Sequence, residues 1–208
     1  MKKAFLTPYI FKNKYKKFVL SINLEWLKYL KYLGFTAGFG NPLTSINEQL
    51  KNIDLVIVSG GGDINYINKK DINLYRDNFE KKVIAIAIKK KIPILAVCRG
   101  FQLISFIYSK NKKHIIKTKN HLDKNHVIYM LKNDILSKNE MINVNSYHAF
   151  GITKMNKNFE ILAFSNDKNI EIAYSKKLKI LGLMFHPERK NISQNKINQI
   201  INNFLKAK

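Results

Sequence analysis

Near its middle the chain reads Ile92-Pro-Ile-Leu-Ala-Val-Cys-Arg-Gly-Phe-Gln102. The apolar run that ends at Val97 predicts a strand buried on both faces, and residues 100–108 are predicted to form a helix. Cys98 would then lie at the turn between strand and helix, where its side chain projects from the carboxyl edge of a sheet. The N-terminus of the following helix favours a thiolate over a thiol. This pattern indicates a nucleophilic cysteine, although a buried structural cysteine would fit the same short stretch.

The composition bounds the class of protein. With 208 residues, of which 46% are hydrophobic, the chain is long enough for one domain over residues 1–208 with a large core. A single cysteine excludes an internal disulfide and is typical of the reducing cytoplasm. The lysine-rich segment 11–17 interrupts any signal-peptide pattern, and no apolar run approaches the roughly 20 residues of a membrane span. We therefore expect a cytoplasmic protein with no membrane partner.

The formal net charge of +23 raises the question of nucleic-acid binding. The lysines are spread over the whole length, however, and only three arginines occur: Arg76, Arg99 and Arg189. Because arginine is the usual reader of phosphates and bases, its scarcity argues against a specific nucleic-acid partner. Each of these arginines falls inside a motif described below, so we expect them to have geometric roles.

Hydrophobic periodicity predicts the order of the elements. In the first half, strands are expected at 4–10, 35–39, 54–58 and 92–97, and helices at 23–33, 45–51, 76–91 and 100–108. Further on, short strands at 114–117, 126–131, 142–144, 159–164, 170–174 and 180–185 would extend the sheet in antiparallel fashion before an amphipathic helix at 194–205. The alternation predicts an α/β fold with an open, centrally parallel sheet. Ligands bind such sheets beyond the carboxyl ends of the strands.

The sequence Ser59-Gly-Gly-Gly-Asp63 follows the strand at 54–58. Three glycines allow backbone N–H groups to face an anionic ligand, although a tight turn with positive φ would also need them. The spacing does not fit a nucleotide phosphate loop. Asp77 and Glu80 are expected in the first turn of the helix at 76–91, where the helix dipole accounts for them without a catalytic role.

His186 and Glu188 follow the predicted strand at 180–185. In an extended segment, two residues that are two apart point to the same side. Glu188 could then fix the tautomer of His186 while His186 faces Cys98, as a thiolate nucleophile requires. Together with Cys98 and the glycine loop at the ends of two other strands, this spacing predicts a Cys-His-Glu triad.

Taken together and in this order, five motifs resemble the class I glutamine amidotransferase-like family and, within it, the γ-glutamyl hydrolase branch. They are residues 59–64, Arg76-Asp77 with Glu80, residues 93–102, residues 144–148 with Gly151, and residues 182–188. The resemblance implies a flavodoxin-like α/β fold and hydrolysis of a γ-glutamyl amide through a thioester, with release of glutamate and an amine. It implies no metal and no organic cofactor.

The resemblance also implies roles for individual residues. The triad would be Cys98, His186 and Glu188, and the backbone N–H groups of Gly61, Gly62 and Arg99 would form the oxyanion hole. The γ-glutamyl group would be held by Gln102, Asn145, Ser146, Tyr147 and His148. For His148 a role in packing or in a turn remains an alternative, and His121 and His126 are interpreted as structural or rim residues.

The chain departs from the family pattern at a few places. Ala96 stands where many members have glycine, and the loops between Asp63 and Arg76 and after Phe106 are short. These short loops resemble the small bacterial γ-glutamyl hydrolases of capsule phosphoramidate synthesis, whose γ-glutamyl group is linked to a cytidine nucleotide. Lysines expected at the mouth of the site would suit such an anionic leaving group, although lysine is abundant everywhere: Lys69, Lys70, Lys112 and Lys113.

Two other functions stay open at this point. The chain could be a glutaminase component that passes ammonia to a separate synthetase, since no synthetase domain is evident in the sequence. It could also be a binding protein that has lost its chemistry, which the intact Cys98, His186 and Glu188 argue against. A homodimer is a further expectation that the sequence alone does not decide.

Overall fold

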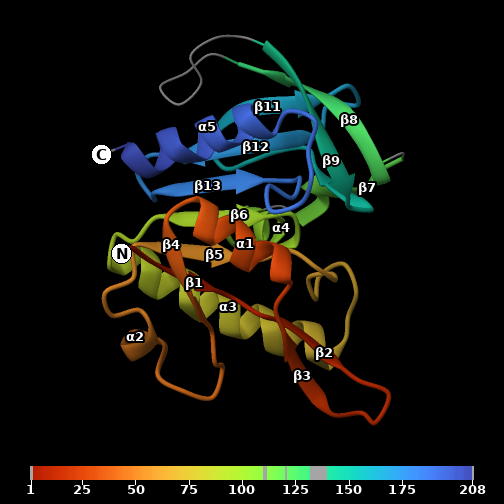
Figure 1. The fold of residues 1–208 in the computed structure, drawn as a ribbon. Coiled ribbons are helices and arrows are strands. Elements are labelled where there is room, and N and C mark those ends of the chain that lie inside the picture. Colours follow the sequence, from red (N-terminus) through yellow and green to blue (C-terminus); the bar gives the residue numbers. More distant parts are fainter. Residues whose placement is uncertain (1, 110–111, 120, 132–139, 208) are drawn as a thin grey trace.

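A nine-stranded sheet forms the centre of the computed structural model, which describes residues 2–109, 112–119, 121–131 and 140–207 (Figure 1). Five neighbouring strands run parallel: β4 (Phe35–Phe39), β1 (Lys2–Leu6), β5 (Leu55–Val58), β6 (Ile94–Val97) and β13 (Ile180–Leu183). Four antiparallel strands continue the sheet: β12 (Ile170–Ser175), β11 (Glu160–Ser165), β8 (Leu122–Met130) and β9 (Glu140–Tyr147). The predicted mixed α/β sheet with an antiparallel extension is therefore confirmed.

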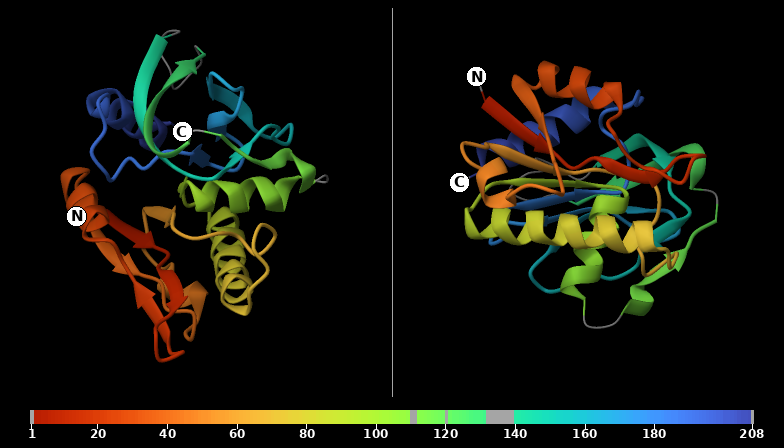
Figure 2. Two further views of the ribbon diagram at one scale, coloured as in Figure 1. Left: turned by 90° about the vertical axis from the view of Figure 1, so that its right-hand side faces the viewer. Right: turned by 90° about the horizontal axis from the view of Figure 1, so that it is seen from below.

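Helices cover both faces of the sheet (Figure 2). Helices α1 (Leu24–Tyr32) and α5 (Gln194–Lys206) pack on one face, and α3 (Asp71–Lys89) and α4 (Arg99–Tyr108) pack on the other. The short α2 (Ile46–Gln49) and a 3₁₀ turn (Lys112–His114) complete the helical segments. Among the described helices, none is long and apolar enough to cross a membrane.

Alternate residues of the central strands supply the two cores. In β5, Leu55 and Ile57 pack toward α1 and α5, whereas Val56 and Val58 pack toward α3 and α4. All four side chains are fully buried. A strand covered on both faces has no polar side, which explains why β5 and β6 are continuous apolar runs in the sequence.

Three parts of the fold differ from the sequence prediction. The first strand ends at Leu6, and after Pro8 the chain forms a separate hairpin of β2 (Tyr9–Lys12) and β3 (Phe18–Ser21). A short β10 (Phe150–Ile152) pairs with β7 (Ile115–Lys117). Helix α3 begins five residues before the predicted start, so Asp71 and not Asp77 is the acid of its first turn. The hairpin was missed because each strand is only four residues long, its apolar residues do not alternate with polar ones, and a lysine-rich turn at 13–17 separates the two strands.

Helix α4 approaches the sheet at Gly100. A Cβ atom at this position would lie 2.1 Å from the Val58 carbonyl oxygen and 2.8 Å from its carbonyl carbon. The backbone of a central strand cannot shift without a large loss of stability, so only glycine allows α4 to lie this close to the Val58 carbonyl. The contact sets where the first turn of α4, and hence Cys98, lies relative to β5.

We predict that Gly100→Ala lowers the free energy of unfolding by about 2–3 kcal/mol, because the added methyl group overpacks a rigid site. Urea denaturation measures this change. Gly38→Ala is the matched control, since a Cβ there would meet only the Ala4 carbonyl oxygen at 3.7 Å, and we expect a change below about 1 kcal/mol. Equal losses in the two variants would contradict the close approach.

Candidate active site

Cys98 lies at the turn between β6 and α4, as the sequence predicts. Its backbone has φ 51° and ψ −108°, a conformation that side-chain-bearing residues rarely adopt. The Cys98 N–H donates a hydrogen bond of 2.7 Å to the Leu183 carbonyl, which fixes the turn to β13. The cysteine is 7% exposed, at the carboxyl edge of the sheet. This is the geometry of a nucleophile elbow.

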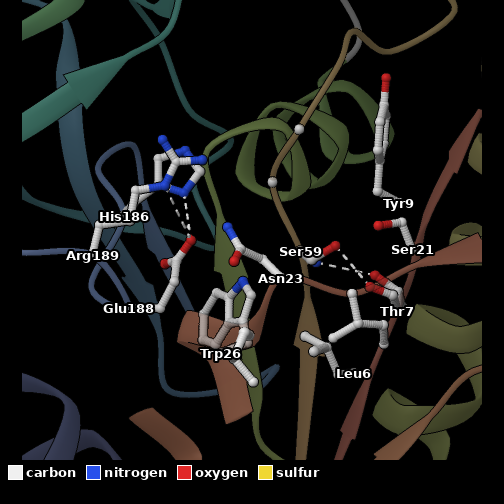
Figure 3. Close-up of a pocket in the computed structure, with 14 residues that line it drawn as sticks. Leu6, Thr7, Tyr9, Ser21, Asn23, Trp26, Ser59, His186, Glu188 and Arg189 are labelled. Carbon is white, nitrogen blue, oxygen red and sulfur yellow. Dashed lines mark hydrogen bonds and ion pairs between the residues drawn. The ribbon is translucent and has the colours of Figure 1, made fainter. Parts of the chain in front are cut away.

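His186 lies beside Cys98, and Glu188 orients it. The His186 Nδ1 and Glu188 Oε1 atoms are 2.7 Å apart, and the Cys98 side chain lies near enough to His186 to raise its pKa. Figure 3 shows the Glu188 carboxylate directed toward the His186 ring and the Arg189 guanidinium. The structure thus brings the three predicted triad side chains together from two strand ends.

The protonation of His186 follows from these contacts. Burial lowers the pKa of His186, but the charge and hydrogen bond of Cys98 and then those of Glu188 outweigh burial and raise the pKa to about 9. His186 is therefore protonated at neutral pH. A protonated imidazole next to a thiolate is an ion pair ready for nucleophilic attack and for proton donation.

The loop after β5 is held in place by Arg76 of α3. Its guanidinium donates to three successive carbonyl oxygens, those of Ser59 at 3.1 Å, Gly60 at 3.0 Å and Gly61 at 2.6 Å. With the carbonyls turned toward α3, the loop can present N–H groups on its other side. A Cβ on Gly60 would lie 2.6 Å from His186 Cε1, so the loop lies directly against the triad.

A buried ion network lies under this loop. The Arg99 side chain contacts both Asp77 and Glu80, and Arg76 Nε lies 2.9 Å from Glu80 Oε1. The expectation that Asp77 and Glu80 are first-turn acids explained by the helix dipole is therefore wrong, because the helix starts at Asp71 and both residues are interior partners of buried arginines. Burial and the nearby Arg99 lower the pKa of Arg76 to about 10, which still leaves it charged at neutral pH.

A pocket of about 260 Å³ opens at Cys98 and is lined by several predicted site residues, among them Gly61, Gly62, Gln102, Tyr147 and His148. The Gln102 Nε2 atom donates to the Phe150 carbonyl at 2.8 Å, so its amide is anchored at the wall of this pocket. The ring of Tyr147 meets His186 edge to face, and the Arg189 guanidinium lies 4.4 Å from the Tyr147 ring centre.

The side chains of Asn145 and Ser146 bond to backbone groups of other segments. The Asn145 side chain accepts a hydrogen bond from the His186 N–H and donates one to the His186 carbonyl, each at 2.8 Å. The Ser146 hydroxyl donates to the His121 carbonyl at 2.5 Å. Both side chains are buried and neither lines the Cys98 pocket. In this structure the Asn145 side chain positions His186, and Ser146 holds β9 to the residue before β8, so a substrate contact by these two residues stays a prediction.

His148 contributes to the pocket wall, but its side chain is buried in the protein. The Nδ1 atom lies 3.1 Å from the Phe150 carbonyl oxygen, and the Nε2 atom faces Glu171. His121 and His126 surround the same glutamate and are not rim residues, contrary to one of the two expectations. Within the described part of the chain, this cluster contains the residues whose spacing suits a metal ion.

A second pocket, of about 480 Å³, lies on the other side of His186 (Figure 3). Tyr9 and Ser21 of the hairpin, together with Asn23 and Trp26, line it opposite His186. Sequence reasoning missed this wall because it missed the hairpin. His186, Gly61 and Arg189 line both pockets, so the triad lies between two cavities.

Comparison with known proteins agrees with this geometry. Residues 34–188 match the Peptidase C26 family. The chain belongs to the Peptidase C26 family, which is class I glutamine amidotransferase-like. The chain is 36% identical over 139 residues to a gamma-glutamyl-CDP-amidate hydrolase of Campylobacter jejuni, and the match covers 67% of this chain. It spans 64% of the length of that protein, which is less than two thirds.

Other relatives are components of GMP synthases. The chain is 32% identical over 183 residues to the glutamine-hydrolysing GMP synthase component of Methanocaldococcus jannaschii, with 86% of this chain and 87% of the relative covered. A crystal structure of the corresponding GMP synthase component from Thermoplasma acidophilum superposes with a TM-score of 0.74 at 19% identity, over 100% of this chain and 94% of that one. That likeness establishes the fold. Membership of a Peptidase C26 family supports a hydrolase.

We predict that the His186 imidazole titrates with a midpoint near pH 9, because Cys98 and Glu188 stabilise its protonated form. Glu188→Gln should lower this midpoint, since the variant keeps the shape of the side chain but removes one of the charges that raise the pKa. NMR of the imidazole between pH 5 and pH 10 measures both. A wild-type midpoint at the ordinary value of 6.5 would contradict the ion pair.

Proposed function

We propose that this Peptidase C26 protein is a cysteine-dependent hydrolase of γ-glutamyl amides. The observation that carries the proposal is the Cys98 turn, with its positive φ and with His186 held between Cys98 and Glu188. An ordinary buried cysteine needs neither a strained backbone nor a histidine whose tautomer is fixed by a carboxylate. The Campylobacter relative supports the γ-glutamyl substrate class.

In the proposed reaction, the Cys98 thiolate attacks the γ-carbonyl carbon of the substrate. The negative charge on the carbonyl oxygen would be stabilised by the backbone N–H groups of Gly61, Gly62 and Arg99, which remain predicted donors. Protonated His186 donates its proton to the amine as the C–N bond breaks, and a γ-glutamyl thioester remains. Water then attacks the thioester with His186 as base, releasing glutamate and restoring the Cys98 thiolate with protonated His186.

For the substrate's leaving amine, we propose a phosphorylated group of the nucleotide diphosphate class. A basic pocket of about 670 Å³ adjoins the Cys98 pocket, and Gly62 and Asp63 line both. Lys69 and Lys70 line it, together with Lys12. Asp63 and Asp71 offset part of this charge. Lys113 is exposed and does not line this pocket, and the side chain of Lys112 lies outside the described part of the structure.

A glutaminase component of a larger enzyme is the second candidate. It is favoured by the match to the GMP synthase component of Methanocaldococcus jannaschii, which covers more of the chain than the match to the hydrolase. In that case glutamine would be the substrate, and ammonia would pass to a separate synthetase. The two functions share the same triad and acyl chemistry, so the identity of the amine distinguishes them.

Glutamate release tests the proposal, with kcat/KM measured for a γ-glutamyl nucleotide diphosphoramidate, γ-glutamyl-GABA and glutamine at low and at about 0.15 M salt. We expect the nucleotide conjugate to have a higher kcat/KM than the other two substrates. This kcat/KM should fall as salt is added, and it should also fall in the double variant Lys69→Gln/Lys70→Gln. The γ-glutamyl-GABA reaction is the internal control, and neither the salt nor the double substitution should change its kcat/KM much. Cys98→Ala should fold normally and lose activity by about a thousandfold or more.

The outcomes separate the parts of the proposal. The anionic leaving group would be refuted if kcat/KM were higher for γ-glutamyl-GABA than for the nucleotide conjugate. It would also be refuted if salt left kcat/KM for the nucleotide conjugate unchanged. Neither result would contradict the hydrolase proposal. Turnover of glutamine alone would favour the glutaminase component. Glutamate release that persists in Cys98→Ala would refute the cysteine mechanism altogether.

A further inference from the structure

Four side chains form a compact cluster behind the Cys98 pocket: His121, His126, His148 and Glu171. We refer to them as the histidine–glutamate cluster. His121 and His148 flank the end of the β8–β9 ladder where Leu122 pairs with Tyr147. His126 lies within β8, and Glu171 comes from β12, which is separated from β8 by β11. Glu171 is fully buried, and His148 and His121 are 3% and 5% exposed. Burying ionisable side chains in a protein core costs free energy unless each charge is neutralised by a partner.

The imidazole nitrogens converge on one carboxylate oxygen. Glu171 Oε1 lies 3.7 Å from His121 Nδ1, 3.4 Å from His126 Nε2 and 3.8 Å from His148 Nε2. These distances exceed those of hydrogen bonds, and no described residue forms a hydrogen bond to any of these nitrogens or to either Glu171 oxygen. In a tetrahedral site with metal–ligand bonds of about 2.0–2.2 Å, the ligand atoms lie about 3.3–3.6 Å apart. The three distances from Glu171 Oε1 are close to the edges of such a tetrahedron.

Hydrogen bonds on the outer side of two rings set their tautomers. His148 Nδ1 lies 3.1 Å from the Phe150 carbonyl oxygen, which can only accept, so the His148 proton is on Nδ1. His121 Nε2 lies 2.9 Å from Asp167 Oδ2, which places the proton of a neutral His121 on Nε2. The nitrogens that face Glu171 then carry lone pairs. Lone pairs directed at a carboxylate repel it unless a cation lies between them.

We propose that the histidine–glutamate cluster binds one divalent transition-metal ion of the zinc class. His121 Nδ1, His148 Nε2 and the Glu171 carboxylate are the ligands, because their ligand atoms all lie within 4.8 Å of one another. His126 Nε2 lies 3.4 Å from Glu171 Oε1 but outside this group of three, and a shift of its ring toward the ion would make it the fourth ligand. Imidazole and carboxylate donors in a closed, buried site suit Zn²⁺ better than Mg²⁺ or Ca²⁺, which prefer oxygen donors and water.

The role we assign to this ion is structural. It would join β8, the turn after β9 and β12, three segments that are distant in sequence. The Phe150 carbonyl accepts hydrogen bonds from His148 and from Gln102, which links the metal site to the wall of the Cys98 pocket. The ion does not touch the triad, so this proposal is independent of the proposed reaction.

Metal analysis of the full chain tests this proposal. Cys98→Ala is the parent protein, which excludes the thiolate as a ligand and has no turnover to confuse the readout. The protein is treated with a chelator, loaded with Zn²⁺ and freed of excess metal. Inductively coupled plasma mass spectrometry should then find about one Zn²⁺ per chain. Zn²⁺ should also raise the melting temperature by about 5 °C or more, since it binds only the folded state.

Substitutions identify the ligands. Glu171→Gln, which keeps the shape of the side chain, and His148→Gln should each reduce the bound Zn²⁺ at least about tenfold. His114→Asn is the matched control: it removes a buried histidine that bonds to Ser105, outside the cluster, and should keep the full Zn²⁺ content. Co²⁺ in place of Zn²⁺ should give a visible absorption spectrum of tetrahedral nitrogen and oxygen coordination.

Two results would overturn the proposal. One is a parent protein that holds no Zn²⁺ or Co²⁺ above the buffer and whose melting temperature does not respond to Zn²⁺, which would make the cluster a proton-linked network. The other is unchanged metal content in Glu171→Gln. Because every readout uses the variant without Cys98, failure here leaves the hydrolase proposal untouched, and failure of the hydrolase leaves the metal site untouched.

Discussion

The buried arginine and carboxylate network beneath the Cys98 turn is the constraint on which the site depends. Arg99 follows Cys98 directly, and its contacts with Asp77 and Glu80 fix the start of α4 to α3. Arg76 shares Glu80 and holds the carbonyls of the glycine loop. Removing one partner of a buried ion pair typically costs about 3–5 kcal/mol, because a charge is left uncompensated. The network therefore makes the loop, α3 and the Cys98 turn one rigid unit.

The remaining half of the site is held by β9, the last strand of the sheet. Asn145 of β9 bonds both backbone polar groups of His186, so the segment after β13 cannot move without breaking two buried hydrogen bonds. Glu188 then has only to orient the ring. Nucleophile and histidine are thus positioned by two separate frameworks that meet at the carboxyl edge of the parallel strands, where α/β sheets place their ligands.

The features of the site that depend on residues close together in the sequence could be predicted. The run from Ile94 to Val97 is buried on both faces, and the residues after it adopt a helix, so the elbow at Cys98 could be predicted. His186 and Glu188 are two residues apart after a strand, and their contact needs only an extended backbone. The triad geometry follows from short-range pattern and strand order.

The parts that could not be predicted depend on contacts between distant segments. Asp77 and Glu80 resemble helix-dipole partners until the fold brings Arg99 beside them. Asn145 resembles a substrate ligand, yet its partner is the backbone of a residue 41 positions away. Glu171 lies in an otherwise apolar strand and meets its histidines only through the order of β12, β11, β8 and β9. The β2–β3 hairpin has four-residue strands in which apolar and polar residues do not alternate, so periodicity gives no sign of the wall that it adds to the second pocket.

The central claim is that Cys98 forms a covalent bond to the γ-glutamyl group. The most direct measurement is peptide mass spectrometry of enzyme quenched with acid during turnover of a γ-glutamyl amide. Our account predicts a γ-glutamyl thioester on the peptide that contains Cys98 in the wild-type enzyme, and no such adduct on the corresponding peptide of Cys98→Ala. Full turnover by the wild-type enzyme with no adduct on this peptide, or with an adduct on another residue, would contradict it.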